Sequence, residues 1–372
     1  MAQRGIKVIK QLWKRFILHL DPVLLAGLGL LVCTSLLVLY SASDGSWSRV
    51  LAQALNIAVA FIALWLVANM PLHYLLRSAV PLYILGMVLL VAVALFGEIS
   101  HGARRWLNIG VATVQPSELM KIAVPLMMAW YFEKHEATLT LKNYFIATLL
   151  LLLPVGLIAR QPDLGTAVLI GASGFYVLFL AGLSWRVMLA TFIAGVASAP
   201  LAWKYLLHDY QKHRIMMLFD PTQDALGQGY HTIQGMIAVG SGGLLGKGYM
   251  HGTQAHLDFL PERTTDFIFA VYSEEFGLLG NLILIGLYLF VIGRGFIITG
   301  NASTYFTRLT AGSITLTFFT YAFVNMGMVS GILPVVGVPL PLISYGGTSM
   351  LTLALGFGML MSIYTHKQLV KT

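Results

Sequence analysis

One carboxylate in this sequence stands where a polar stretch gives way to an apolar one. Asp266 follows the polar run from Leu260 to Thr265 and precedes the apolar run from Phe267 to Val271. Only 10% of the residues are charged, and a charge at a lipid boundary has a solvation cost that favours a functional explanation. Such a carboxylate can act as a general base on a substrate held at the membrane surface. The alternative is a structural carboxylate at a helix N-terminus.

A second carboxylate follows in the same apolar run but is badly placed to share a reaction with Asp266. On a helix, Glu274 would lie about 12 Å deeper and some 80° around the axis. Two carboxylates that flank one glycosidic bond need to face each other across it. A single base instead suits a transfer reaction whose leaving group needs no proton, such as a pyrophosphate stabilised by Arg, Lys or a divalent cation. We expect Glu274 and Glu275 to satisfy polar groups inside the protein.

An acid and a base three residues apart form the second feature with chemical potential. Pro116 can open a helix and Glu118 suits its first turn. The spacing of Glu118 and Lys121 puts both side chains on one helical face, where they can pair. Two interpretations stay open: a buried ion pair that fixes helix packing, and a charged wall of a substrate pocket.

Basic residues recur beside the apolar runs. Those expected near the outer surface are Arg104, Arg105, Arg160, Lys204, Lys212, Arg214 and Lys247. Arginine makes two-point contacts with phosphate oxygens, which favours a phosphorylated lipid as the ligand. The alternative is a basic loop that meets anionic headgroups. The net charge of +8 is dispersed between apolar segments, a pattern typical of membrane topology and not of nucleic-acid binding.

Two glycine-rich segments need an explanation. The run 239–248 resembles a nucleotide-binding loop, but Ser241 occupies its first glycine position and Gly248 follows Lys247 where Ser or Thr is required. We interpret it as flexible or tightly turned backbone near a ligand or partner. The run 331–347 is apolar but contains prolines and glycines that exclude a continuous helix. We expect a re-entrant segment that lines the Asp266 site, or else an interfacial loop.

The elements that must position these residues are predicted to be membrane helices. Of the 372 residues, 58% are hydrophobic and the mean hydropathy is +0.79, and apolar runs recur near the roughly 20 residues that cross a bilayer. The sequence therefore predicts an all-α polytopic membrane protein that forms one transmembrane domain over residues 1–372. The ten expected spans are 23–42, 51–70, 79–97, 116–132, 143–160, 164–182, 188–204, 266–293, 309–329 and 347–364.

The distribution of Lys and Arg predicts that both termini lie in the cytoplasm. Thirteen basic residues fall in the expected inner segments: Arg4, Lys7, Lys10, Lys14, Arg15, Arg77, Lys134, Lys142, Arg186, Arg294, Arg308, Lys367 and Lys371. Four fall in the short outer ones: Arg49, Arg104, Arg105 and Arg160. Residues 1–21 read as an amphipathic helix on the inner leaflet. The stretch 205–265 is then one long outer loop, which puts Asp266 at the outer face.

Several motifs in one order resemble the SEDS family of peptidoglycan glycosyltransferases over nearly the whole chain. They are Arg105-Trp106, Gln115-Pro116-Ser117-Glu118 with Lys121, Gln161 to Thr166, Arg214 to Pro221, Gly246-Lys247-Gly248, the Asp266 segment, and Pro339 to Gly347. The resemblance implies an enzyme of the bacterial inner membrane that polymerises lipid II at the periplasmic face. The short N-terminus and Leu260-Pro261-Glu262-Arg263 favour the elongation enzyme over the division paralogue.

The resemblance also assigns roles to residues. Asp266 matches the family's essential aspartate, and Glu118 with Lys121 match a charged cavity pair. Further substrate-binding residues are expected at Arg105, Asp163, Arg214, Lys247, Glu262 and Ser344. Family members often carry a histidine where this chain has Thr264, so the aspartate is left as the sole candidate base.

The expected reaction begins when Asp266 takes the proton from the 4-hydroxyl of the acceptor GlcNAc. The oxygen attacks the donor MurNAc with inversion, and undecaprenyl pyrophosphate leaves. A divalent cation (Mg²⁺ or Mn²⁺) held through Asp266 is an open expectation, and Glu262 could orient Arg263 or help to hold the cation. The implied partners are a class B penicillin-binding protein, the elongation machinery and membrane lipids. The alternatives are a flippase for lipid-linked sugars and a scaffold in which Asp266 is dispensable.

Overall fold

The computed structural model describes residues 19–100, 103–108, 113–161, 163–205, 212, 216–218, 228–256, 260 and 262–366. The predicted juxtamembrane helix, apart from its last three residues, lies outside the described residues. So does much of the predicted long loop 205–265.

The ten predicted spans all correspond to long helices. These are α2 (Pro22–Ala42), α3 (Trp47–Ala68), α4 (Leu72–Phe96), α5 (Pro116–Lys134), α6 (Leu141–Arg160), α7 (Leu164–Leu180), α8 (Trp185–Tyr205), α12 (Ile268–Gly300), α13 (Tyr305–Val329) and α14 (Gly347–Thr365). Seven helices among the described residues are long and apolar enough to cross a membrane. α7 has only 17 residues, and α5 and α8 carry charges near their ends. The prediction of an all-α polytopic membrane protein is confirmed.

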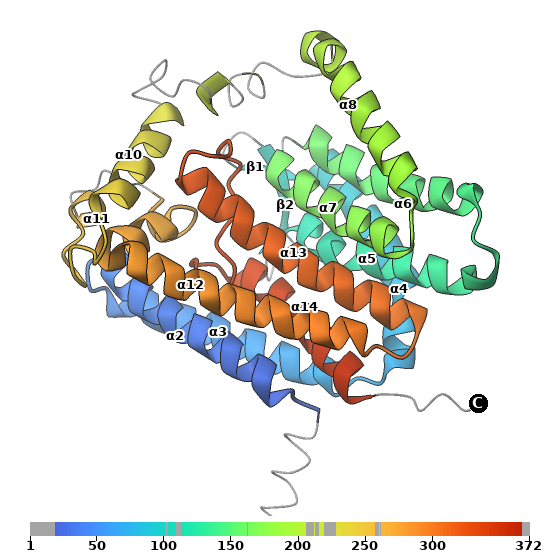
Figure 1. Cartoon of the computed structure of the whole chain (residues 1–372), viewed down its shortest axis with the longest axis horizontal. Helices are drawn as coiled ribbons and strands as arrows, with labels where there is room; N and C mark the ends of the chain where they lie inside the picture. The colour runs from blue at the N-terminus through green and yellow to red at the C-terminus, as the bar shows by residue number, and fades with distance from the viewer. Residues whose placement is uncertain are drawn as a thin grey trace, which may run out of the picture.

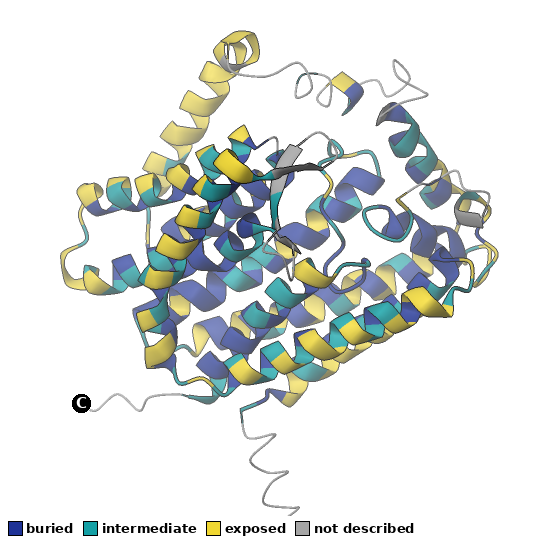
Figure 2. Ribbon diagram, turned by 180° about the vertical axis from the view of Figure 1, so that it is seen from behind, coloured by how far each residue is buried: buried dark blue, intermediate teal, exposed yellow. Residues whose placement is uncertain are grey.

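Helix α13 is the centre of the bundle. It packs against α12, α7, α5 and α14, while α3 packs against α14 and α4 against α5. Figure 1 shows α13 crossing the middle of the molecule, and Figure 2 shows that the buried residues concentrate in these inner helices. Residues on α13 can therefore contact several parts of a site at once.

The first and last described residues of the chain lie together at one end of the helix bundle. Asp21 caps α2 by accepting a hydrogen bond from the Val23 N–H at 3.1 Å. Its carboxylate also pairs with Arg294 on α12 through two contacts of 2.7 and 3.2 Å. His19 stacks on His366, with ring centroids 4.2 Å apart. A fully buried carboxylate of this kind needs such partners, and the pair fixes α2 against α12.

The opposite end of the bundle contains Asp266 and several segments that connect one helix to the next. A small antiparallel sheet, β1 (Glu98–Ser100), β2 (Ala103–Asn108) and β3 (Thr113–Val114), joins α4 to α5. Two further helices, α10 (Gln228–Ser241) and α11 (Thr253–His256), fall within the predicted loop. Neither the sheet nor these helices were predicted, because each is too short and too polar to give a hydropathy signal.

The glycine-rich run 239–248 docks against a break in α12. Gly277 has φ 64° and ψ −161° inside that helix, which leaves backbone groups on either side without helical partners. The glycine run bonds with them: the Lys247 and Gly248 N–H groups donate to the Glu274 and Glu275 carbonyls at 3.0 Å. A Cβ at Gly246 would overlap the Glu275 carbonyl. The prediction of tightly turned backbone is confirmed, and what it contacts is this break.

The segment 331–346 is irregular, as predicted, and its residues 340–344 are buried. Side chains of surrounding helices satisfy its carbonyls. Ser35 of α2 donates to the Ile343 carbonyl at 2.8 Å, and Tyr288 of α12 donates to that of Pro341 at 2.7 Å. Buried non-helical backbone in a membrane protein requires such partners. The segment is thereby fastened to the bundle on several sides.

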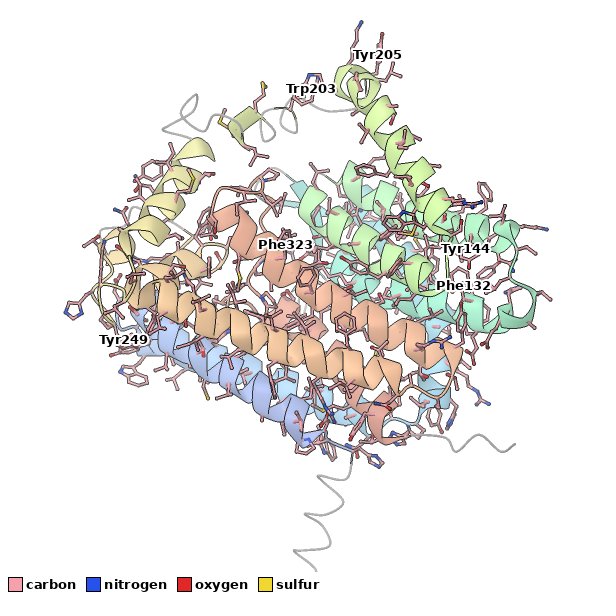
Figure 3. The ribbon with its side chains drawn as sticks, in the orientation of Figure 1. Phe132, Tyr144, Trp203, Tyr205, Tyr249 and Phe323 are labelled. Carbon is pink, nitrogen blue, oxygen red and sulfur yellow. The ribbon has the colours of Figure 1, made fainter. Side chains whose placement is uncertain are left out.

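Helix α8 stands apart from the other helices (Figure 1) and is exposed along nearly its whole length. Figure 3 shows Trp203 and Tyr205 at its far end, away from the bundle. An apolar helix without a protein partner on any side is stable where lipid surrounds it.

Candidate functional site

Asp266 lies in a tight turn directly before α12. The N–H groups of Thr265 and Phe267 both donate to the Glu262 carbonyl, at 3.2 and 3.1 Å. The Thr265 hydroxyl donates to the Glu262 carboxylate at 2.6 Å. The helix begins at Ile268, two residues later than the predicted span, so Asp266 belongs to the turn and not to the membrane helix.

Three successive carbonyls of this turn are held by two other parts of the chain. The Tyr345 N–H donates to the Thr264 carbonyl at 2.9 Å. The Ser344 hydroxyl donates to the Thr265 carbonyl at 2.6 Å, and the Asn325 amide donates to the Asp266 carbonyl at 2.8 Å. The main chain at Asp266 is therefore fixed by the irregular segment 331–346 and by α13.

The Asp266 side chain is half-buried next to Gly337 of the segment 331–346. A Cβ at Gly337 would lie 3.4 Å from the Asp266 Oδ2. Burial raises the pKa of Asp266 from 3.8 to about 6, and the neighbouring Glu262 carboxylate adds to the rise. A carboxylate with this pKa is mostly ionised at neutral pH and is a stronger base than an exposed aspartate.

Glu118 and Lys121 form a buried pair on α5, with Oε1 and Nζ 2.5 Å apart. The Lys121 ammonium lies 5.1 Å from the centre of the Tyr321 ring on α13. The side chains of Lys121 and Glu118 are only 6% and 13% exposed, so each needs the other for charge compensation. The pair predicted from sequence spacing is therefore present, and Tyr321 connects it to α13.

Asp163 joins the same polar cluster from α7. Its Oδ1 caps α7 by accepting from the Thr166 N–H, and its Oδ2 accepts from the Gln115 amide, both at 3.3 Å. Gln115 is the residue that precedes α5. Through these bonds Asp163 ties the start of α7 to the start of α5, where Glu118 stands.

Helix α13 connects the Asp266 turn to the Glu118–Lys121 pair through two residues one helical turn apart. Tyr321 faces Lys121 and Asn325 holds Asp266, and residues four apart lie about 6 Å apart along a helix. A small buried cluster of Leu169, Tyr321 and Val338 packs at the same level. The structure thus brings three predicted residues, Glu118, Lys121 and Asp163, to one side of the turn that carries Asp266.

The other predicted residues have different surroundings. Lys247 pairs with the buried Glu274 at 2.6 Å, at the break in α12. Glu274 also accepts from the Thr253 and Gln254 N–H groups, at 2.8 and 3.1 Å, as expected of a carboxylate that satisfies polar groups inside the protein. The Ser344 hydroxyl is occupied by the Thr265 carbonyl and by the Leu340 N–H at 2.8 Å.

Three predictions concern residues near the edge of what the structure describes. The Arg263 guanidinium, which we expected Glu262 to orient, contacts Asp44 at 2.6 Å. The backbone of Arg105 lies in β2. Its side chain, and Arg214 as a whole, are outside the described residues.

Asn325, Tyr321 and Gln53 belong to this region but were not predicted. Gln53 of α3 donates to the Ser344 carbonyl at 3.2 Å. The sequence feature that could have identified these residues is a polar side chain within an otherwise apolar span. Asn325 carried that signal, and it is fully buried.

The residues around Asp266 allow a limited test of a cation site. Among the described residues, no group of three or more His, Cys, Asp or Glu side chains could hold a metal ion. Asp266 and Glu262 do provide two neighbouring carboxylates. Mg²⁺ is commonly held by one or two carboxylates together with substrate phosphates, so the donor set fits a cation that arrives with a phosphorylated substrate.

The fold and these residues define a polytopic helical membrane protein with a half-buried carboxylate and a buried ion pair that α13 connects. The chain belongs to the cell cycle protein family FTSW_RODA_SPOVE, whose profile matches residues 16–369. It is 50% identical to the peptidoglycan glycosyltransferase MrdB of Escherichia coli K12 over 361 residues, which are 97% of each chain.

Solved structures have the same fold. A chain from a peptidoglycan synthase complex that coordinates polymerization and crosslinking superposes with a TM-score of 0.80 at 29% identity, covering 92% of this chain and 97% of that one. The rod shape determining protein RodA of Thermus thermophilus gives a TM-score of 0.70 at 27% identity, with 92% and 96% covered.

Proposed function

We propose that this protein is a peptidoglycan glycosyltransferase that polymerises lipid II into glycan strands during elongation of the lateral wall. The observation that carries the proposal is Asp266, a half-buried carboxylate with a pKa of about 6 at the start of a membrane helix. The 50% identity to a peptidoglycan glycosyltransferase supports the reaction. Similarity to a rod shape determining protein supports the role in elongation.

In the proposed reaction Asp266 accepts the proton of the 4-hydroxyl of the acceptor GlcNAc. The hydroxyl oxygen forms a bond to the anomeric carbon of the donor MurNAc as the bond to the pyrophosphate oxygen breaks. The anomeric centre is inverted, and undecaprenyl pyrophosphate leaves as an anion. The proton stays on Asp266 until water removes it.

The leaving group needs positive charge because pyrophosphate develops negative charge as it departs. Lys121, Arg105 and Arg214 are the candidates. Lys121 and Lys247 each already pair with a carboxylate, and Lys247 is the weaker candidate because it lies at the break in α12, whereas Lys121 lies beside Tyr321 on α13. A divalent cation held by Asp266 and Glu262 would stabilise the same charge when bound. Asp163, by tying α7 to α5, would keep the wall of the site in place.

We further propose one transmembrane domain in the bacterial inner membrane, with both termini in the cytoplasm and Asp266 at the periplasmic face. The match to a chain of a synthase complex supports a class B penicillin-binding protein as partner. That enzyme would crosslink the strand that this one makes.

The test uses purified protein, labelled lipid II, and a gel that resolves glycan chains. Wild type, alone or with its partner, should form polymer, and Asp266→Asn should form none. Asp44→Asn is the matched control, because this carboxylate lies at the same end of the molecule but pairs with Arg263. Equal polymer from wild type and Asp266→Asn would refute the mechanism. Lipid II transfer across vesicle membranes without polymer would favour the flippase.

A further inference from the structure

We infer that Asn325 and Ser344 are positioning residues that hold the Asp266 turn in its reactive orientation. Their polar groups bind main-chain carbonyls of adjacent residues: the Asn325 amide binds that of Asp266 at 2.8 Å and the Ser344 hydroxyl binds that of Thr265 at 2.6 Å. The inference rests on the proposed function, because it assigns these two side chains a role in the same reaction.

Asn325 joins the two parts of the chain that surround the aspartate. Its amide nitrogen donates to the Asp266 carbonyl and also to the Val338 carbonyl, at 2.7 Å. Both neighbours are acceptors, so the atom between them must be the nitrogen and the orientation of the amide is unambiguous. One fully buried side chain therefore ties the Asp266 turn to the segment 331–346.

Ser344 provides the second tie from within the segment 331–346. Its hydroxyl accepts from the Leu340 N–H at 2.8 Å and donates to the Thr265 carbonyl. The serine is buried, so loss of its hydroxyl would leave the Leu340 N–H without its acceptor and the Thr265 carbonyl without its donor. The segment contacts Asp266 from the other direction through Gly337, where a Cβ would lie 3.4 Å from Oδ2. The position of the carboxylate thus depends on both side chains.

The bound carbonyls lie outside the hydrogen-bond ladder of α12, which begins at Ile268. The helix can therefore form without Asn325 and Ser344, whereas the direction of the preceding turn needs them. The bonds within the turn, from the Thr265 and Phe267 N–H groups to the Glu262 carbonyl, hold its shape but do not fix its direction relative to α13. A displacement of about 1 Å of a reacting group costs roughly 100-fold in rate, so loss of either tie should act on kcat.

The first experiment compares three substitutions of Ser344 in the full-length protein. Ser344→Thr keeps the hydroxyl. Ser344→Val introduces a side chain with nearly the shape of threonine but without the hydroxyl. Both add a methyl group to a buried site, so any packing defect is shared. We expect kcat for lipid II polymerisation to be about 10- to 100-fold lower in Ser344→Val and Ser344→Ala than in Ser344→Thr, with KM within twofold.

The second experiment uses Asn325→Asp and Asn325→Ala. Aspartate has the shape of asparagine but cannot donate to two carbonyls, so both variants should lose kcat to a similar extent. Asn143→Ala is the control, because that buried asparagine also donates its amide to a carbonyl, the one of Thr138 at 3.0 Å. It should keep wild-type kcat. Since both ties act on one turn, the double variant Asn325→Ala/Ser344→Val should lose less than the product of the single losses.

The outcomes separate this inference from the proposed function. Polymer from wild type, none from Asp266→Asn, and normal kcat in the Asn325 and Ser344 variants would overturn the inference alone. Equal kcat for Ser344→Thr and Ser344→Val would overturn it as well, as would losses explained entirely by a smaller folded fraction. Absence of polymer from wild type with its partner would overturn the proposed function itself.

Discussion

Replacing Asp266 by asparagine should stabilise the protein at neutral pH while removing the proposed base. The pKa of the carboxyl is raised from 3.8 to about 6 by burial and by Glu262. Each pKa unit corresponds to about 1.4 kcal/mol, so ionisation of Asp266 lowers the stability of the folded protein by at most about 3 kcal/mol. Water that reaches the half-buried carboxylate reduces this figure. The neutral amide has nearly the same shape and lacks the charge.

The direction of the pH dependence follows from proton binding. Between about pH 4 and pH 6 the folded protein keeps the proton on Asp266 while the unfolded chain has lost it, so wild-type stability falls as the pH rises. Below about pH 4 both states are protonated, and wild type and Asp266→Asn should be similarly stable. Above about pH 6 the variant should be more stable by the full amount.

The measurement is thermal unfolding in detergent, followed by intrinsic fluorescence at pH 4.5, 6 and 8. We expect Asp266→Asn to unfold several degrees above wild type at pH 8, and the difference to shrink at pH 4.5. Asp44→Asn removes a carboxylate that pairs with Arg263 and should not raise the unfolding temperature at pH 8. A variant that is less stable than wild type at pH 8, or a difference independent of pH, would refute the argument that burial raises the Asp266 pKa.

Three further predictions concern activity and packing. The kcat/KM of polymerisation should fall as the pH drops below about 6, because the base becomes protonated. Glu262→Gln should move this fall to lower pH, because it removes the neighbouring charge that raises the Asp266 pKa. The pH profiles of both proteins test this. Lys121→Met should lower the unfolding free energy by about 3–5 kcal/mol, because Glu118 is left buried and unpaired. Adding Glu118→Gln to this variant should restore much of the lost stability, measured by melting curves, and no recovery would argue against the pair. Gly246→Ala should lower Tm, because φ there is +79° and a Cβ would overlap the Glu275 carbonyl. Gly240→Ala should leave Tm unchanged or raise it, because Gly240 lies in α10 and a Cβ there meets nothing within 4 Å.

Much of the fold could be predicted because hydropathy over roughly 20 residues is a strong signal for membrane helices. The ends were less accurate. The span predicted from residue 79 begins at Leu72, because His73 and Arg77 in the first turns of α4 lowered its apparent hydropathy. The break at Gly277 could not be predicted, since a glycine within an apolar run is common in membrane helices.

The candidate site could be predicted where both partners lie on one helix. Glu118 and Lys121 pair because their spacing alone makes them neighbours. The partner of Lys247 is 27 residues away, at the break in α12, and no local pattern announces it. Ser344 was expected at the substrate, yet its hydroxyl is used within the protein. Asn325 was missed because its bonds depend on the path of the irregular segment.

The contact between the glycine run and the break in α12 limits how the length of this chain can vary. Four backbone bonds join the two segments, from Lys247 and Gly248 to the carbonyls at 274 and 275, and from Leu278 and Leu279 to those of Gly243 and Leu244. One residue inserted between Leu244 and Lys247 would shift one pair of bonds relative to the other. Homologous chains should therefore keep a constant number of residues from 243 to 248, whereas an insertion outside this run leaves the four bonds in register.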